Sequence, residues 1–172
     1  MVFQKILVAL DLSPQSPKVF EQALEIAQNE HSQLMLFHCL SWDVEGEAGL
    51  FMGTVGGADL YGSLLGQRQK HLQDEVKTVR EWLQTYQQQA TSMGIATEFD
   101  CRIGDLGPQI CALAHTWQTD LIVIGRRGYK GLSEIWLGSV SNYVIHHAPC
   151  SVLIVQGVTP PVEQVESQSK RI

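Results

Sequence analysis

Residues 121–140, "LIVIGRRGYKGLSEIWLGSV", join a short apolar run to a segment rich in glycine and basic residues. The apolar run predicts a buried strand of a parallel sheet. Directly after it, Arg126, Arg127 and Lys130 stand between glycines, and they are three of only twelve basic residues in the chain. Glycine-rich turns and helix starts present backbone N–H groups to anions. The segment therefore predicts a polyphosphate site at the end of the strand.

The glycines have a defined spacing, Gly125-x2-Gly128-x9-Gly138-Ser139. This spacing is neither a Walker A loop nor a G-x-G-x-x-G fingerprint. The Gly138-Ser139 pair stands where the next helix is expected to begin, and free N–H groups and the helix dipole favour negative charge there. The hydroxyls of Ser139 and Ser141 could add hydrogen bonds. The alternative is an ordinary turn whose arginines face water, but the strand before and the helix after it favour phosphate binding.

On both sides of this segment, strand-like apolar runs alternate with amphipathic helical patterns. Strands are expected at residues 4–10, 33–40, 95–104, 120–125 and 151–156. Helical faces are formed by Val19, Phe20, Ala23, Leu24 and Ala27, by Leu72, Val76, Val79, Leu83 and Tyr86, and by Ile110, Leu113, Ala114 and Trp117, with a further helix at 140–147. The alternation predicts an α/β fold whose parallel sheet is covered on both faces. Such sheets bind ligands at the carboxyl ends of their strands, beside a switch in strand order.

The segments outside these strands and helices show different sequence patterns. The first helix carries a start signal, with Ser13 or Ser16 as the cap and a proline at the first helical position. Residues 43–66 hold seven of the fifteen glycines and no basic residue. They predict a long flexible connection, because loops of that length are usually functional or disordered. The polar residues 157–172 predict a frayed tail.

The composition restricts the class of protein. A chain of 172 residues with 44% hydrophobic and 17% charged residues suits one globular domain. The net charge of −6 argues against binding to a nucleic-acid backbone, and no apolar run reaches the length of a membrane span. The scattered cysteines predict buried, reduced thiols of a cytoplasmic protein. No metal cage made of protein groups alone is visible, so a metal would come with the phosphates.

Three stretches resemble the universal stress protein family: "KILVALDLS" at 5–13, "GRRGYKGLSEIWLGSVS" at 125–141 and "HAPCSVLIV" at 147–155. The resemblance covers about residues 3–156, and the spaced glycines mark the ATP-binding branch of that family. It implies a doubly wound, five-stranded α/β domain at 1–156, of the kind also called adenine nucleotide alpha hydrolase-like. It further implies a cytoplasmic homodimer that pairs through the last strand, 151–156, and acts in stress response through a protein partner that the sequence does not identify.

The resemblance also implies a ligand, ATP or a related adenine nucleotide, with Mg²⁺ or Mn²⁺ as a plausible companion. Asp11 would hydrogen-bond the nucleoside or help to hold the metal, and the backbone at Cys39 would meet the adenine edge. The doubled arginine departs from many family members, which often carry Ser and His there, and it favours a highly charged nucleotide. The full set of residues expected at the nucleotide is Ala9, Leu10, Asp11, Ser13, Cys39, Gly125, Arg126, Arg127, Gly128, Tyr129, Lys130, Gly131, Gly138, Ser139, Val140 and Ser141.

Simpler roles compete for several of these residues. Asp11 could merely cap the turn that follows its strand, and Asp105 is expected to cap the third helix. His38, Trp82 and Trp117 are expected to pack in the core, whereas Trp136 could help to close the loop over a ligand.

Three functions remain open at this point. The first is a regulator that binds ATP and signals through its conformation. The second is a slow ATPase or autokinase, which ranks lower because its only candidate groups, Ser139, Ser141 and Asp11, have no evident activating partner. The third is an interaction module in which the nucleotide is a structural filler and residues 43–66 face a partner or act as a lid.

Overall fold

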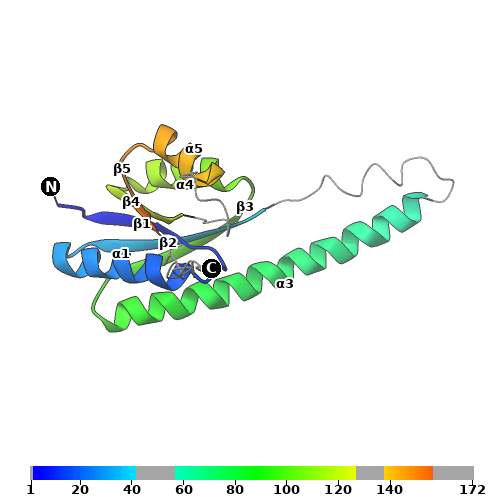
Figure 1. Ribbon diagram of the computed structural model, residues 1–172. Coiled ribbons are helices and arrows are strands. Elements are labelled where there is room, and N and C mark those ends of the chain that lie inside the picture. Colours follow the sequence, from blue (N-terminus) through cyan, green and yellow to red (C-terminus); the bar gives the residue numbers. More distant parts are fainter. Residues whose placement is uncertain (1, 42–56, 127–137, 157–172) are drawn as a thin grey trace, which may run out of the picture.

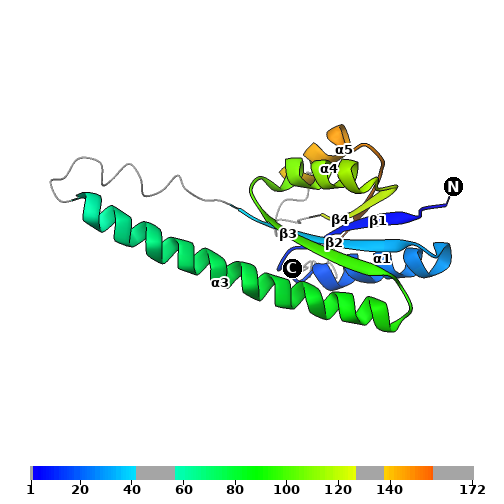
Figure 2. The same ribbon diagram turned by 180° about the vertical axis from the view of Figure 1, so that it is seen from behind.

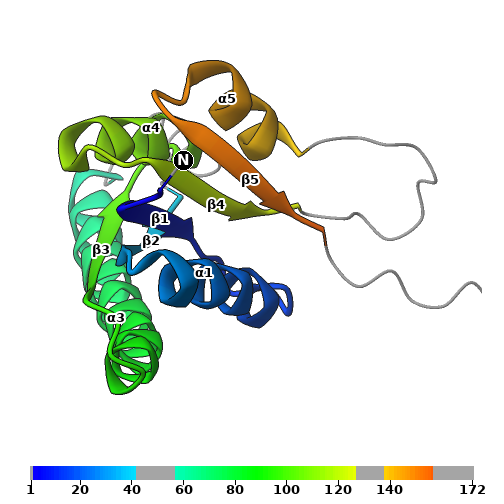
Figure 3. The same ribbon diagram turned by 90° about the vertical axis from the view of Figure 1, so that its left-hand side faces the viewer.

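A computed structural model describes residues 2–41, 57–126 and 138–156, without the side chains of 57–65. The described residues form one five-stranded parallel sheet with the order β3-β2-β1-β4-β5. Figure 3 shows the sheet between the two pairs of helices. The strands are β1 Lys5–Ala9, β2 Gln33–Leu40, β3 Thr97–Ile103, β4 Leu121–Gly125 and β5 Ser151–Val155. The α/β architecture predicted from the alternating pattern is confirmed.

The described helices are α1 Ser16–Glu30, α3 Gly57–Ser92, α4 Leu106–Trp117 and α5 Ser139–His147. Helices α1 and α3 cover one face of the sheet, and α4 and α5 cover the other (Figure 3). Because both faces are covered, the inner strands β1 and β4 are apolar at successive positions rather than at alternate ones. The α1 face predicted from the sequence is the face that is buried.

The strand order reverses at β1, and this reversal positions the site. From β1 the chain adds β2 and then β3 on one side, and afterwards β4 and β5 on the other. Strands β1 and β4 are therefore neighbours, with Ala9 beside Ile124. The helices that follow them in the chain, α1 and α5, cover opposite faces of the sheet (Figure 3). An opening is expected between two such helices, at the carboxyl ends of the two strands.

The predicted start of the first helix needs correction. Gln15 occupies the N-cap position, and its side chain makes no capping hydrogen bond. The Ser16 hydroxyl is instead bonded to the backbone and carboxylate of Asp11. Pro17 lies in the first turn, as the second helical residue rather than the first as predicted, where the N–H that it lacks would be unpaired anyway.

The predicted loop at 43–66 is wrong over its second part, because 57–66 belong to helix α3. The glycine content suggested a loop, yet single glycines in a helix cost only about 1 kcal/mol each. The sequence "ADLYGSLLGQRQKHL" contains no proline and continues into the strongly amphipathic part of the helix. Residues 42–56 lie outside the described residues.

Two smaller expectations are corrected as well. Asp105 does stand at the N-cap of α4, but its side chain makes no capping hydrogen bond. All four cysteines are free, as predicted, but they are partly exposed rather than buried. Trp136 and the tail at 157–172 lie outside the described residues, so the predictions on them stand as predictions.

Leu83 of α3 tests how strongly that helix is anchored to the sheet. Its side chain is 0% exposed and belongs to the core between the sheet and α1 and α3. Replacing Leu83 with Ala leaves a cavity, so we expect a loss of about 2–5 kcal/mol in the free energy of unfolding. Urea denaturation followed by circular dichroism measures it. Met93→Ala is the matched control, since Met93 is 44% exposed and should change stability by less than about 0.5 kcal/mol. Equal losses in the two variants would contradict this packing.

Candidate functional site

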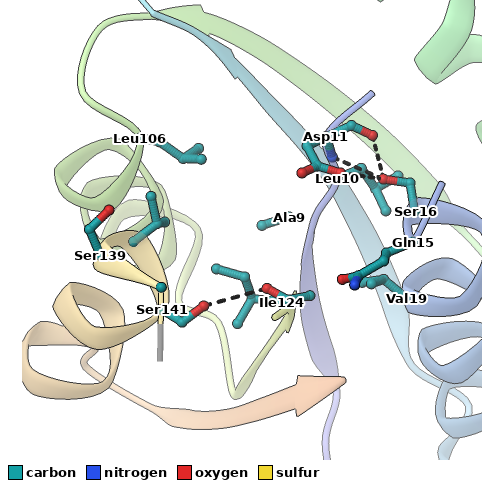
Figure 4. A pocket seen from close by; sticks show the side chains of 13 residues that line it. Ala9, Leu10, Asp11, Gln15, Ser16, Val19, Leu106, Ile124, Ser139 and Ser141 are labelled. Atoms are coloured by element: carbon teal, nitrogen blue, oxygen red, sulfur yellow. Dashed lines mark hydrogen bonds between the residues drawn. The ribbon is translucent and has the colours of Figure 1, made fainter. Parts of the chain in front are cut away.

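A cavity of about 120 Å³ opens at the carboxyl ends of β1 and β4, between α1 on one side and α4 and α5 on the other (Figure 4). A single buried water needs only about 10–15 Å³, so the cavity has room for part of a larger ligand. The lining residues are Ala9, Leu10, Asp11, Gln15, Ser16, Val19, Leu106, Ile124, Gly125, Gly138, Ser139, Val140 and Ser141.

Eight of the residues predicted to meet a nucleotide line this cavity. They come from the end of β1, the end of β4 and the first turn of α5, which are far apart in the sequence. The eight are Ala9, Leu10, Asp11, Gly125, Gly138, Ser139, Val140 and Ser141. The fold thus brings together Gly125, the start of α5 and the end of the first strand.

The end of β1 is held in place by β2 and by a buried histidine. The Leu10 backbone N–H donates to the Phe37 carbonyl oxygen at 2.9 Å, which extends the β1–β2 ladder by one residue. The Leu10 carbonyl oxygen lies 2.8 Å from His38 Nδ1. His38 is buried, with the edge of the Trp82 ring against it. Both residues therefore pack in the core as predicted, and His38 positions the backbone at the cavity.

Asp11 is oriented by the turn that follows it. The backbone N–H of Ser13 donates to Asp11 Oδ1 at 3.1 Å, and the Ser13 hydroxyl is bonded to the same oxygen. The Asp11 backbone N–H donates to Ser16 Oγ at 3.1 Å, and that oxygen lies 3.0 Å from Asp11 Oδ1. The simpler role expected for Asp11, stabilising its turn, is therefore observed. The same turn holds the carboxylate at the edge of the cavity (Figure 4).

Gly125 allows α1 to pack closely on the end of β4. A Cβ at this position would lie 2.9 Å from Val19 Cγ2, which is closer than side chains approach one another. On the other side, the buried Ser141 hydroxyl donates to the Gly125 carbonyl oxygen at 3.4 Å. Gly125 thus joins elements on both faces of the sheet.

The first turn of α5 presents its backbone to the cavity. Gly138 is the N-cap, and the first bond within the helix runs from the Asn142 N–H to the Gly138 carbonyl at 2.9 Å. The N–H groups of residues 139–141 come before that bond, so the helix itself leaves them without acceptors. The Ser139 hydroxyl is exposed beside them. The helix dipole adds partial positive charge at the same place, so the arrangement suits an anion.

Most of the remaining lining is apolar, with Gln15 and Ser16 as its polar members. Leu10, Val19, Leu106, Ile124 and Val140 contribute aliphatic side chains from both faces of the sheet. Apolar walls with a few fixed polar groups are typical of small-molecule sites. The cavity therefore combines an apolar part, a carboxylate and a helix start.

Sequence reasoning missed five of the lining residues, namely Gln15, Ser16, Val19, Leu106 and Ile124. Ile124 was within a predicted strand, and Val19 was within a predicted core face. Only the strand order shows that they also meet at one opening. Gln15 gave no signal at all, because a glutamine just before a helix has no distinctive spacing.

Three predicted residues do not line the cavity. The Ser13 hydroxyl is hydrogen-bonded to the Asp11 carboxylate. Cys39 lies near the end of β2, with its Sγ 3.4 Å from the Gly104 carbonyl oxygen. Arg126 is the first residue after β4. The Arg126 backbone N–H donates to the Val155 carbonyl at 2.9 Å, whereas its buried Nε has no hydrogen-bond partner among the described residues. Arg127, Gly128, Tyr129, Lys130 and Gly131 lie outside the described residues. Within the part of the chain that is described, no cluster of three or more His, Cys, Asp or Glu side chains could hold a metal.

The family model named "Universal stress protein family" matches residues 3–156, so the chain belongs to this family. Its relatives include Universal stress protein Sll1388 of Synechocystis sp., 45% identical over 156 residues, which cover 91% of this chain and 99% of that protein. Universal stress protein A homolog 2 of Coxiella burnetii is 33% identical over an alignment that covers 90% of this chain and 95% of that protein.

Solved structures share the fold at lower sequence identity. The protein MJ0577 superposes with a TM-score of 0.73 at 18% identity, with 93% of this chain and all of that chain covered. A universal stress protein from Archaeoglobus fulgidus in complex with dAMP gives 0.59 at 19% identity, covering 90% and 98%. Another universal stress protein, solved in complex with cAMP, gives a TM-score of 0.58 at 20% identity, with the same shares of the two chains covered. At these identities the likeness establishes the doubly wound fold alone.

Cys39 tests the environment at the end of β2. Burial, followed by the nearby Cys101 and Asp105, raises the pKa of its thiol to about 11 against the lowering effect of Arg102. A raised pKa means a neutral thiol at pH 7, so we expect slow alkylation by iodoacetamide there and a rise in rate only toward pH 11. Peptide mass spectrometry of Cys39 after timed labelling measures the rate, and urea-unfolded protein is the control. A midpoint near the ordinary value of about 8.5 in the folded protein would contradict this environment.

Proposed function

We propose that this protein binds ATP, or a related adenine nucleotide, in the cavity and acts as a nucleotide-responsive regulator in stress response. The observation that carries the proposal is the convergence of Asp11, Gly125 and residues 138–141 on one opening at the switch in strand order. Doubly wound sheets place their ligands at this position. Each of the three segments offers the chemistry that a different part of a nucleotide needs.

The nucleoside would lie against the end of β1. Leu10, Ile124 and Leu106 offer apolar contact to a purine or ribose. The Asp11 carboxylate, oriented by Ser13 and Ser16, would accept a hydrogen bond from a ribose hydroxyl. The predicted contact of the adenine edge with the backbone at Cys39 is part of this proposal, because Cys39 is the last residue but one of β2, which neighbours β1.

The phosphates would lie at the start of α5. The N–H groups of residues 139–141 and the exposed Ser139 hydroxyl supply donors there. Arg126 adds positive charge after β4, and its buried Nε lacks a partner among the described residues, which an anionic ligand could supply. Residues 127–131 are proposed to wrap the phosphates, with Mg²⁺ or Mn²⁺ held mainly by phosphate oxygens and assisted by Asp11.

Gly138 supports the proposal because the described residues do not require a glycine there. Its φ is −56° and ψ is 154°, a conformation open to most residues. A Cβ at Gly138 would meet nothing within 4 Å among the described residues. A glycine that neither the backbone nor the packing demands, at the mouth of a cavity, suits the close approach of a ligand to the backbone.

Two structural neighbours add support for an adenine nucleotide. They were solved in complex with cAMP and with dAMP, which share an adenine base and a phosphate. We extend that ligand class to this chain and favour ATP because of the run of basic residues after β4.

A homodimer through residues 151–156 is part of the proposal. Strand β5 is an edge of the sheet, so one row of its backbone groups lacks a strand partner within the described sheet. A cytoplasmic location is also proposed, because the four cysteines are free, as is usual in a reducing compartment. Among the described residues, no helix has both the length and the apolar character needed to cross a bilayer.

The alternative functions keep a lower rank. A slow ATPase or autokinase needs a base beside its nucleophile, yet the Ser141 hydroxyl donates to the Gly125 carbonyl oxygen. An interaction module that uses the nucleotide as a structural ligand remains compatible with the same cavity. Turnover that scales with protein concentration and is lost in Asp11→Ala would favour the enzyme.

Gly138→Val tests the proposed function. We expect the variant to keep its fold and its thermal midpoint, because the added Cβ meets no atom of the described residues within 4 Å. We expect its affinity for ATP to fall by about tenfold or more, because the side chain occupies the ligand's approach to the α5 backbone. Isothermal titration of ATP in the presence of Mg²⁺ measures the affinity.

Gly66→Val is the matched control, since a Cβ there also meets nothing within 4 Å and Gly66 is on α3, away from the cavity lining. This control should bind ATP like the original protein. An unchanged ATP affinity in folded Gly138→Val would overturn the proposed placement of the phosphates.

A further inference from the structure

Gln15 is a polar residue of the cavity lining to which the proposed nucleotide contacts assign no partner. It is the N-cap residue of α1, and Figure 4 shows its side chain pointing from the start of that helix into the opening. Figures 1 and 2 show from opposite sides that α1 and α5 lie on the two different sides of the sheet. Gln15 therefore belongs to the wall of the cavity that is opposite the start of α5.

The backbone of Gln15 is fixed by the turn that also holds Asp11. Its N–H donates to Ser13 Oγ at 3.3 Å, and that serine is bonded to the Asp11 carboxylate. The Gln15 carbonyl oxygen accepts from the N–H groups of Lys18 and Val19 at 3.0 and 3.1 Å, in the first turn of α1. The side chain of Gln15 thus starts from a defined position at the edge of the cavity.

The Gln15 amide reaches the end of β4. A Cβ at Gly125 would lie 3.6 Å from Gln15 Oε1, and because glycine has no Cβ, the amide approaches the strand backbone from the α1 face. The Ser141 hydroxyl of α5 donates to the Gly125 carbonyl oxygen at 3.4 Å. Gln15 therefore lies beside the residue at which the basic, glycine-rich segment of the sequence begins.

The polar side chains of the lining differ in whether the protein itself supplies them with a partner. Ser16 is bonded to Asp11, and Ser141 is bonded to the end of β4. The side chains of Gln15 and Ser139 make no hydrogen bond with any of the described residues. These two groups stand on opposite walls, so a ligand that crosses the opening could meet both of them.

The phosphate chain is the part of a nucleotide that fits the position of Gln15. Its first phosphate is proposed to lie at the N–H groups of residues 139–141, so any further phosphates extend away from α5. The end of β4, where Gly125 is followed by the basic Arg126, offers them a path toward the α1 wall. The Gln15 amide has two N–H donors and no charge, so it can donate to a phosphate oxygen.

We propose that the Gln15 amide donates a hydrogen bond to the phosphates beyond the first, and that this contact makes the site selective for ATP over AMP. The single phosphate of AMP would stay at the start of α5 and gain nothing from Gln15. This role of Gln15 rests on the proposed function, from which it takes the nucleotide and its direction in the cavity.

Two variants, Gln15→Ala and Gln15→Glu, test this role. Neither should lower the thermal midpoint, because the Gln15 side chain makes no capping hydrogen bond and a carboxylate at a helix start is favourable. We expect Gln15→Ala to bind ATP about three- to tenfold more weakly, the usual effect of one lost hydrogen bond. Gln15→Glu should bind ATP about tenfold or more weakly, because its carboxylate faces the phosphates. The affinity for AMP should stay unchanged in Gln15→Ala and fall less than that for ATP in Gln15→Glu. Isothermal titration in the presence of Mg²⁺ measures both ligands.

Gln28→Glu is the matched control, since it makes the same charge change at an exposed position of α1 outside the cavity lining. It should leave both affinities unchanged. A loss for ATP that exceeds the loss for AMP supports the role of Gln15. Equal losses for the two ligands, which a contact with the nucleoside would give, overturn it and leave the proposed function in place. Unchanged ATP affinity in both Gln15 variants has the same consequence. An original protein that binds neither ATP nor AMP overturns the proposed function as well.

Discussion

The reversal of strand order between β1 and β4 is the constraint on which the site depends. Side-by-side pairing of these two parallel strands, with Ala9 beside Ile124, brings the end of the first strand next to a segment more than a hundred residues later. The helices α1 and α5 lie on opposite faces (Figure 3), so neither of these two helices closes the gap above the two strand ends. The cavity is the direct consequence of this connectivity.

Close packing then gives the cavity its polar features. Gly125 permits Val19 to approach β4, and Ser141 attaches α5 to the same residue by a hydrogen bond. Asp11 is held by Ser13 and Ser16, and the preceding residue is held by His38. The same few contacts that join the layers therefore orient the carboxylate and the helix start toward one opening.

Much of this could be predicted from the sequence. Apolar runs and helical faces predicted the strands and the buried side of α1, because burial on both faces of a parallel sheet requires them. The glycine spacing predicted that residues 125 and 138–141 meet at one site, and the cavity lining agrees. The roles of Ala9, Asp11 and the other proposed contacts in binding a nucleotide stay predictions.

Other features could not be predicted from local sequence patterns. The N-cap of α1 was assigned to a serine, but Ser16 bonds to Asp11 instead, and such a competition is decided by the conformation of the turn rather than by residue type. The helical state of 57–66 was missed because glycine content is a weak signal against a helix that propagates from a packed segment. Gln15 at the cavity was missed because its place depends on how α1 sits against β4.

The measurement that tests the central claim most directly is the identity of the ligand that the purified protein carries. The protein is purified without added nucleotide and denatured, the released small molecules are identified by mass spectrometry, and protein found empty is titrated with ATP and Mg²⁺. The account predicts an adenine nucleotide, either released at close to one per chain or bound on titration. A protein that releases no nucleotide and also fails to bind ATP would contradict the account of the cavity.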